Sequence, residues 1–301
     1  MKIVDYLKKL INDYYLTDNI LEKRRIAKFI YTFYNSINVY DFHDTKVYRE
    51  FKKLYRNFMA SINYKKENDS EKEECKKYVD NANEDLLFLK ELLKYIKVKV
   101  KKTIRTDNIG TLEQFYEYIK SNKNFYNIYK NIKYELVLDE NIISGVTLKS
   151  KDKYSFILEN LNISLLLHEL MHIYNKFSFS KYYETPSIIA EMAITNRFNI
   201  DDDLSRIDDI KSLKPLVKRG IKDLEDYYNF CYGIASLIAV SFVNQYGNNF
   251  NDVIKVSDYV IKNEYVSLSK LFEFLNINES EIIDSVNNIE KILTYKKSKL
   301  K

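Results

Sequence analysis

The chain has 301 residues, with 48 Lys and Arg against 43 Asp and Glu, so its formal net charge at pH 7 is only +5. A charge this small and this dispersed does not predict a nucleic-acid-binding surface, and no apolar run has the length of a membrane span. Gly (5) and Pro (2) are scarce, which favours a mostly helical protein because both residues interrupt helices.

The two cysteines, Cys75 and Cys231, lie far apart in sequence, which predicts reduced thiols and not a disulfide framework. The chain begins with MKIVDYLKKLINDYYL, which lacks the apolar segment and cleavage site of a signal peptide. We therefore expect a cytoplasmic protein that begins with an amphipathic helix.

Residues 1–62 predict two or three amphipathic helices, because their apolar residues recur every three or four positions. The charge run at 64–77 (YKKENDSEKEECKK) is typical of a solvated helix or loop. A helical pattern resumes at 81 and continues to about 106. Its end at 97–102 alternates Lys with Val and fits either a polar helix face or a strand.

The middle of the chain changes character. Thr111 and Gln114 form a capping box that opens a helix over 111–132. Segments 134–137 and 144–158 are rich in β-branched and aromatic residues and contain turn signals, so they predict two or three short strands. We expect a mainly α fold of the α+β class, with a short sheet directly before the next helix.

That helix, expected over 164–177 (SLLLHELMHIYNKF), carries the sequence HELMH from His168 to His172. Residues four apart lie on one helix face, so both histidines can offer a ring nitrogen to one metal ion. Glu169 lies one position round the helix, where its carboxylate can reach a metal-bound water instead of the metal. The arrangement is typical of zinc peptidases, in which this glutamate is the general base.

Two of the three histidines in the chain fall in this motif. A His-Glu-His cluster in an apolar helix is unfavourable to bury without a metal or polar partners, so we predict one Zn²⁺ per chain. The third histidine, His43, lies in the N-terminal helical region and is more typical of an ordinary side chain.

A catalytic zinc takes three protein ligands and keeps one position open, which leaves a carboxylate as the third ligand. Glu184 and Glu191 are the candidates, in a helix expected over about 185–198. Because they are seven residues apart, they point to the same side of that helix. One can bind the metal while the other hydrogen-bonds a ligating histidine.

An acidic turn at 201–203 follows, and the remaining predicted helices cover about 221–246, 250–262, 268–275 and 279–296. We expect an N-terminal helical region over 1–108 and a catalytic region over 109–301, packed together as one unit.

The segment from Glu184 to Glu191, ETPSIIAE, resembles the third-ligand segment of the thimet oligopeptidase and oligoendopeptidase F family of zinc peptidases, Glu-x-x-Ser-x-x-x-Glu. The resemblance implies Glu184 as the ligand and Glu191 as a supporting carboxylate. The gap from His172 to Glu184 is shorter than in that family, and Glu191 would fit the longer spacing of other Glu-liganded zinc peptidases.

The resemblance covers about residues 110–301. GVTL from Gly145 and YSFILEN from Tyr154 are similar to two strands before the family's active helix. DYYNFCYGIAS, from 226 to 236, is similar to its Tyr-rich helix, and the segment 262–277 is similar to its C-terminal segment without the glycines.

The resemblance also implies which residues would contact the substrate. Gly145, Val146 and Tyr227 would bind the peptide, and Tyr232 and Tyr228 would stabilise the oxyanion. The family's histidine upstream of the Tyr-rich helix is missing here.

We therefore predict a zincin-like helical peptidase that hydrolyses short peptides, with His168, His172 and Glu184 as zinc ligands and Glu169 as general base. One alternative is a regulatory zinc protease that cleaves a single protein partner. Another is a catalytically inactive, zinc-containing scaffold that binds peptides. We expect no nucleic-acid or membrane partner.

Overall fold

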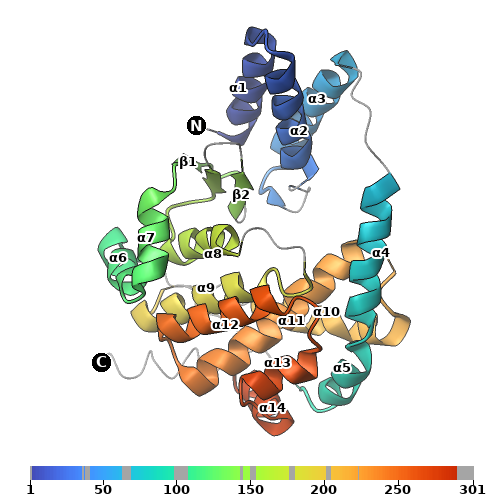
Figure 1. Ribbon diagram of the computed structural model, residues 1–301, viewed down its shortest axis with the longest axis vertical. Helices are drawn as coiled ribbons and strands as arrows, with labels where there is room; N and C mark the ends of the chain where they lie inside the picture. Colours follow the sequence, from blue (N-terminus) through green and yellow to red (C-terminus); the bar gives the residue numbers. More distant parts are fainter. Residues whose placement is uncertain are drawn as a thin grey trace.

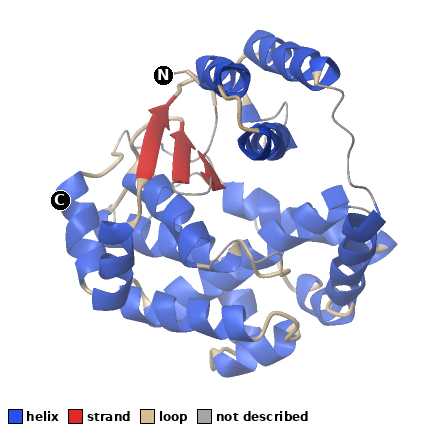
Figure 2. Ribbon diagram, turned by 45° about the horizontal axis from the view of Figure 1, so that its top comes forward, coloured by secondary structure: helices blue, strands red, loops and turns tan. Residues whose placement is uncertain are grey.

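The computed structural model describes residues 2–35, 37, 41–62, 69–97, 108–142, 145–149, 154–175, 180–200, 205–222 and 224–289. Within these ranges, helices surround a small three-stranded sheet (Figures 1 and 2). The predicted mainly α fold, with a short sheet before the histidine helix, is confirmed. Of the described helices, none has both the length and the apolar character needed to cross a membrane.

The helices are α1 (Ile3–Leu16), α2 (Ile20–Asn35), α3 (Thr45–Ser61), α4 (Asp69–Asn83), α5 (Leu86–Leu93), α6 (Leu112–Lys120), α7 (Lys123–Asn131), α8 (Ile163–Tyr174), α9 (Thr185–Phe198), α10 (Ser205–Arg219), α11 (Leu224–Tyr246), α12 (Phe250–Lys262), α13 (Leu268–Phe274) and α14 (Glu279–Asn287). The strands are β1 (Tyr134–Leu138), β2 (Gly145–Lys149) and β3 (Tyr154–Leu158).

Helices α1 to α3 form an apolar core against one face of the sheet, at the top of Figure 1. The sheet region contributes the buried residues Val137, Ile142 and Ile157. Two polar contacts fix the first helix on the sheet. The backbone N–H of Ile3 donates to Asp139 Oδ2 at 2.6 Å, and the hydroxyls of Tyr6 and Ser155 are 2.8 Å apart.

The sheet has the order β1-β3-β2, with β1 parallel and β2 antiparallel to the central β3. Among the described strands, β2 therefore lies at an edge. Its register pairs Gly145 with Leu158 and Thr147 with Phe156, and both partners belong to the larger core around α8. Since side chains alternate along a strand, Gly145 and Thr147 face α8 and the intervening Val146 faces the N-terminal helices, whose core it contacts.

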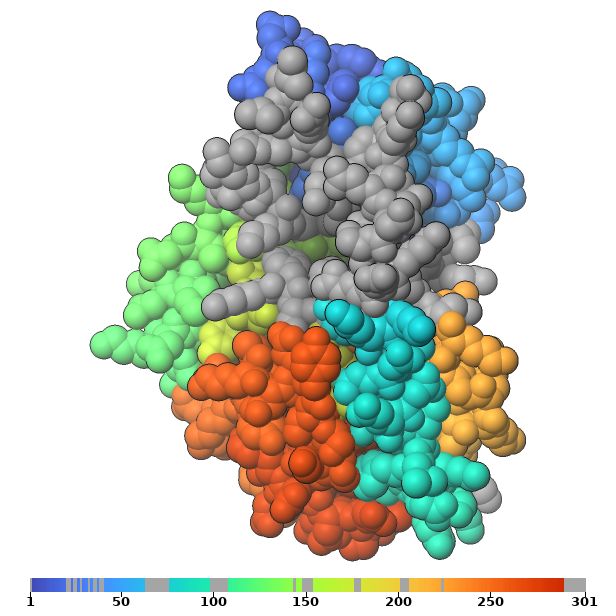
Figure 3. All heavy atoms as spheres, turned by 45° about the vertical axis from the view of Figure 1, so that its right-hand side comes forward, coloured from blue at the N-terminus to red at the C-terminus, as the bar shows by residue number. Residues whose placement is uncertain are grey.

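The larger core joins α8, α9 and α11 with the surrounding helices, and it includes residues of α5. Figure 3 shows α4 and α5 beside the C-terminal helices on one face of the molecule. There, the backbone N–H of Leu268 donates to Asp85 Oδ1 at 2.8 Å. Residues between 82 and 96 thus share the core of the region after 108, and the division at 108 stays a prediction.

The capping box of Thr111 and Gln114 is present as predicted. The single helix expected over 111–132 is wrong, because Asn122 caps a second helix by accepting a hydrogen bond from the Phe125 N–H. Helix α10 is an addition, since no element is predicted over 205–219. The acidic turn at 201–203, most of 97–102, and 290–296 lie outside the described residues. Cys231 is a buried free thiol.

Candidate metal centre

Helix α8 carries the histidine motif into the larger core. Asn162 caps it by accepting a hydrogen bond from the Ser164 N–H, and the helix ends at Tyr174, before the predicted 177. Most residues of the helix are buried, and His168 is 7% exposed and Glu169 3%. His172 is also largely covered, with 15% of its side chain exposed.

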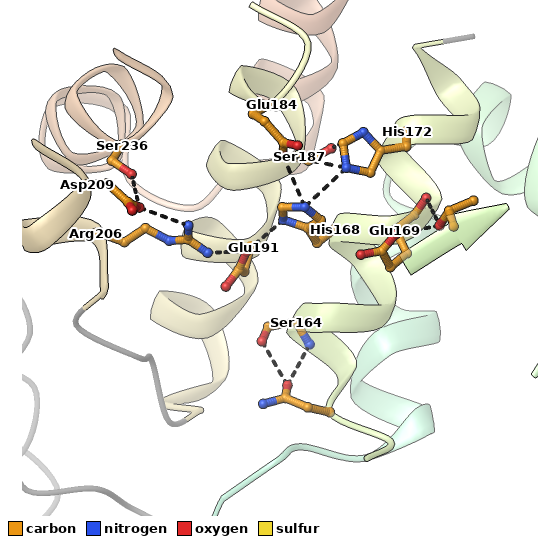
Figure 4. A network of polar contacts seen from close by, with 12 residues as sticks. Ser164, His168, Glu169, His172, Glu184, Ser187, Glu191, Arg206, Asp209 and Ser236 are labelled. Atoms are coloured by element: carbon orange, nitrogen blue, oxygen red, sulfur yellow. Dashed lines mark hydrogen bonds and ion pairs between the residues drawn. The ribbon is translucent and has the colours of Figure 1, made fainter. Parts of the chain in front are cut away.

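Glu184 lies at the N-cap position of α9, but its side chain does not cap the helix. Its carboxylate points toward the two histidines instead (Figure 4). Oε2 of Glu184 is 3.3 Å from His168 Nε2 and 3.5 Å from His172 Nε2, and the two Nε2 atoms are 3.2 Å apart. Three ligand-type atoms from two helices thus form a nearly equilateral triangle.

This triangle fits a metal ion. Tetrahedral zinc holds nitrogen and oxygen ligands at about 2.0–2.2 Å, which separates the ligand atoms by about 3.3–3.5 Å. Glu184 Oε2 is buried and lacks a hydrogen bond of good geometry within the described part of the chain, as expected for an oxygen directed at a cation. His168, Glu169 and His172 also form a group that could hold a metal ion, with ligand atoms within 4.8 Å of one another.

Glu191 and Arg206 support the outer side of His168. One oxygen, Glu191 Oε2, lies 2.8 Å from His168 Nδ1 and accepts a hydrogen bond from an Arg206 guanidinium nitrogen at 2.7 Å. Arg206 also contacts Asp209 at 3.4 Å, and Asp209 accepts from the Ser236 hydroxyl at 2.9 Å. Figure 4 shows these groups as a continuous chain from α11 through α10 and α9 to α8.

The charges of these groups shift their pKa values strongly. Burial by itself lowers the pKa of His168, but contacts with Glu184 and Glu191 raise it to about 10. Burial opposes ionisation of the carboxyls, yet the charge of His172 and contact with His168 lower the pKa of Glu184 to about 2. The charge of Arg206, with His168, lowers the pKa of Glu191 to about 2. Both carboxylates are therefore ionised, and in the metal-free protein His168 holds a proton that a metal would replace.

Glu169 lies between the histidines and β2, with a carboxylate oxygen within 4.8 Å of the histidine ligand atoms. The Thr147 hydroxyl donates to Glu169 Oε2 at 2.5 Å. A Cβ placed on Gly145 would lie 2.7 Å from Glu169 Oε1, closer than non-bonded atoms approach. The edge strand therefore holds one carboxylate oxygen and leaves room for the other.

Tyrosines surround the histidines on the α11 side. Burial, together with the nearby carboxylates of Glu184 and Glu169, raises the pKa of the Tyr232 hydroxyl well above the usual value. Tyr232 is therefore a proton donor at neutral pH. The Tyr183 ring lies 6.4 Å from the His172 ring and 6.5 Å from that of Tyr232. Tyr228 is 45% exposed, with its ring 6.2 Å from that of Tyr183.

Other expected site residues lie apart from this cluster. Tyr227 is buried in the larger core and packs against Tyr78, with a ring separation of 6.1 Å. The Val146 side chain contacts the N-terminal core on the opposite face of the sheet. His43 lies 3.1 Å from Glu159. The substrate contacts expected of Tyr227 and Val146 stay predictions.

Five residues of the site are not predicted by the sequence: Thr147, Tyr183, Arg206, Asp209 and Ser236. Arg206 and Asp209 had a detectable signal, since Ile207, Ile210, Leu213 and Leu216 recur at helical spacing and would place both on one helix. Thr147 depends on the register of β2 against β3, which local sequence does not contain.

No protein-family model and no curated protein matches the chain. A structural match was found to the crystal structure of a Bacillus anthracis (strain Ames) protein provisionally named oligoendopeptidase F. It has a TM-score of 0.36 and 14% sequence identity, and it covers 83% of this chain. The chain spans 63% of that structure's length.

Proposed function

We propose that the protein is a zinc-dependent peptidase that hydrolyses short peptides. The observation that carries this proposal is the triangle of ligand atoms from His168, His172 and Glu184, with sides of 3.2, 3.3 and 3.5 Å. Glu191 contacts the Nδ1 atom of His168 and not the Nε2 pair. This supports Glu184 as the third ligand and Glu191 as the carboxylate that orients His168.

Zinc bound by these residues would supply a Lewis acid that polarises the scissile carbonyl and lowers the pKa of a water molecule. Glu169 is the general base. Its carboxylate takes a proton from the attacking water as the water oxygen adds to the carbonyl carbon, and then delivers that proton to the leaving amine nitrogen. The Thr147 hydroxyl holds Glu169 Oε2 at 2.5 Å, which leaves Oε1 as the oxygen that accepts the proton.

The edge strand β2 is suited to an extended peptide. Its main chain lies beside α8, with Gly145 and Thr147 at the Glu169 carboxylate. A peptide that pairs with an exposed edge strand is held by main-chain hydrogen bonds, which do not depend on its sequence. This geometry supports short, unstructured substrates.

Tyr232 is the candidate donor to the oxyanion. Its raised pKa keeps the phenol protonated beside Glu184 and Glu169. A donor in a water-poor site stabilises negative charge that develops on the former carbonyl oxygen. The same hydroxyl interacts with the Glu184 carboxylate, so a second role is support of the ligand carboxylate.

Zinc content and cleavage of a quenched fluorescent peptide library test the proposal. We expect wild type to carry one zinc and to cleave peptides. Glu169→Gln should keep zinc, and its kcat should fall by about 10²–10⁴-fold, which is the contribution of a general base. Glu184→Gln should lose the metal. Glu117→Gln changes an exposed glutamate and should match wild type.

Other outcomes reassign the site. A wild type that binds zinc and cleaves no library peptide contradicts the oligopeptidase proposal and favours a scaffold or a single-partner protease. Zinc retained by Glu184→Gln but lost by Glu191→Gln would make Glu191 the third ligand.

A further inference from the structure

We infer that Arg206 is a positioning residue for the metal centre, anchored by Asp209 and Ser236, and that it acts through Glu191 on His168. The inference rests on the proposed function, because it assigns Arg206 a role in metal affinity. It concerns a helix, α10, for which the sequence predicts no element.

The contact geometry places Arg206 directly behind the ligand system. Glu191 Oε2 is shared by two donors, with Arg206 at 2.7 Å and His168 Nδ1 at 2.8 Å. A carboxylate oxygen that Arg206 holds in place can accept the Nδ1–H of His168, which leaves Nε2 as the metal-binding nitrogen. The side chains of Arg206 and Glu191 are 12% and 13% exposed, so water screens their interaction little.

The opposite side of the guanidinium is anchored as well. A second nitrogen of Arg206 lies 3.4 Å from Asp209 Oδ2, which also accepts from the Ser236 hydroxyl of α11 at 2.9 Å. The two helices approach closely at Gly233, where a Cβ would lie 2.5 Å from Leu213 and 3.0 Å from the Asp209 carbonyl oxygen. The close approach of α10 and α11 thus fixes the position from which Arg206 reaches Glu191.

A planar guanidinium can bridge two carboxylates at once, whereas an ammonium is a single point charge. Arg206 therefore neutralises the charge of Glu191. Because Asp209 holds the other side of the guanidinium, Arg206 also fixes the orientation of the Glu191 carboxylate. Without it, Glu191 would be free to rotate away from His168 Nδ1. Loss of such an outer hydrogen bond weakens metal binding by about 10–100-fold in known metal sites.

The test is the Zn²⁺ dissociation constant, measured by competition with a chromophoric chelator. We expect Arg206→Met to weaken zinc binding by about 10–100-fold and Arg206→Lys to have an intermediate effect. The matched control is Arg219→Met. Arg219 lies at the other end of α10 and pairs with Asp226 at 2.5 Å, and this variant should bind zinc as wild type does.

A double-mutant cycle separates positioning from general structural support. If Arg206 acts through Glu191, adding Arg206→Met to Glu191→Gln should weaken zinc binding by less than about threefold further. Asp209→Asn keeps Arg206 but removes the charge that anchors it, so it should weaken zinc binding by less than Arg206→Met does. If Arg206→Met does not fold, Asp209→Asn takes its place in the test. Thermal unfolding of the metal-free variants shows how much of each change is stability.

The outcomes distinguish failure of the positioning role from failure of the proposed function. An Arg206→Met loss that is equally large in the Glu191→Gln background, or a lowered Tm with unchanged zinc affinity, overturns the positioning role alone. Zinc affinity that depends on Arg206 in a protein that cleaves no peptide supports the positioning role and contradicts the proposed function. A wild type that binds no zinc overturns both.

Discussion

Helix α8 has two different environments on its two sides. Toward α9 and α10, the histidines meet two ionised carboxylates and a guanidinium, each in contact with at least one other charged group. Toward β2, the Glu169 carboxylate meets one hydroxyl and a glycine. On the first side, these contacts fix the orientation of the side chains, as metal ligands require.

On the second side, the Glu169 carboxylate has a less charged environment. A general base must gain and lose a proton at each turnover. A carboxylate bound by several cations would hold its charge too strongly to accept a proton. A single hydroxyl, that of Thr147, sets the orientation of the Glu169 carboxylate. The two sides should therefore respond differently to substitution, in metal affinity on one side and in turnover on the other.

The largest effect should come from a buried ion pair that anchors the ligand side from outside the site. Lys181 precedes Glu184 by three residues, and its ammonium lies 2.6 Å from Asp85 Oδ2, with both side chains at most 2% exposed. Asp85→Asn leaves that ammonium without its countercharge, so we expect the free energy of unfolding to fall by about 3–5 kcal/mol. Chemical denaturation measures it.

Two further variants sharpen this result. Asp85→Asn combined with Lys181→Met removes both charges and should recover much of the loss, because isolated buried charges are the main cost. Glu50→Gln breaks an exposed pair with Lys8 and should change stability by less than about 1 kcal/mol. A loss of that small size for Asp85→Asn would contradict the anchoring role.

The next largest effect is expected at Tyr232, which lies between the two sides. Tyr232→Phe removes the hydroxyl near Glu184 and Glu169. If it donates to the oxyanion, kcat should fall by about 10²–10³-fold with unchanged zinc affinity. Steady-state kinetics and chelator competition measure both, with the exposed Tyr95→Phe as control. A loss of zinc affinity that accounts for the whole effect would assign Tyr232 to Glu184 instead.

Sequence alone identified the parts of the site whose geometry is local. His168 and His172 are one helical turn apart, and Glu184 and Glu191 are two turns apart, so helix periodicity brings each pair to one side. Glu184 contacts His168 at Nε2 and Glu191 contacts it at Nδ1. Both contacts depend on how α9 packs on α8.

The remainder depends on tertiary contacts. Helix α10 contains Pro215, a residue that is unfavourable inside helices, and the helix that carries Arg206 is missed although its apolar residues recur at helical spacing. The partner of Arg206 is set by the close approach of α10 and α11 at Gly233. Gly145 was expected from the family resemblance, but its contact with Glu169 depends on the antiparallel register of β2 and β3. Tyr227 and Tyr228 are neighbours in sequence, yet one is buried and the other exposed.

On the β2 side, Gly145→Ala should act on turnover without affecting metal binding. Its new Cβ would lie 2.7 Å from Glu169 Oε1 and 2.9 Å from a Leu158 methyl, so the carboxylate must move. A shift of about 1 Å in a catalytic group can reduce rate by about 10²-fold. We expect kcat to fall by about 10–100-fold with zinc affinity unchanged. A loss of zinc in this variant would show that the two sides of α8 are not independent.

The smallest effect, and the finest test of the comparison, is expected at Thr147. Thr147→Val keeps the shape of the side chain and removes the hydroxyl that donates to Glu169 Oε2. A hydrogen bond to a charged group contributes about 1.5–3 kcal/mol, so part of this loss should appear as a fall in kcat of about 10-fold. Thr147→Ser keeps the donor and should stay near wild type. If Thr147→Val has full activity while Gly145→Ala does not, β2 acts on Glu169 through steric fit and the hydroxyl has no role in orienting the base.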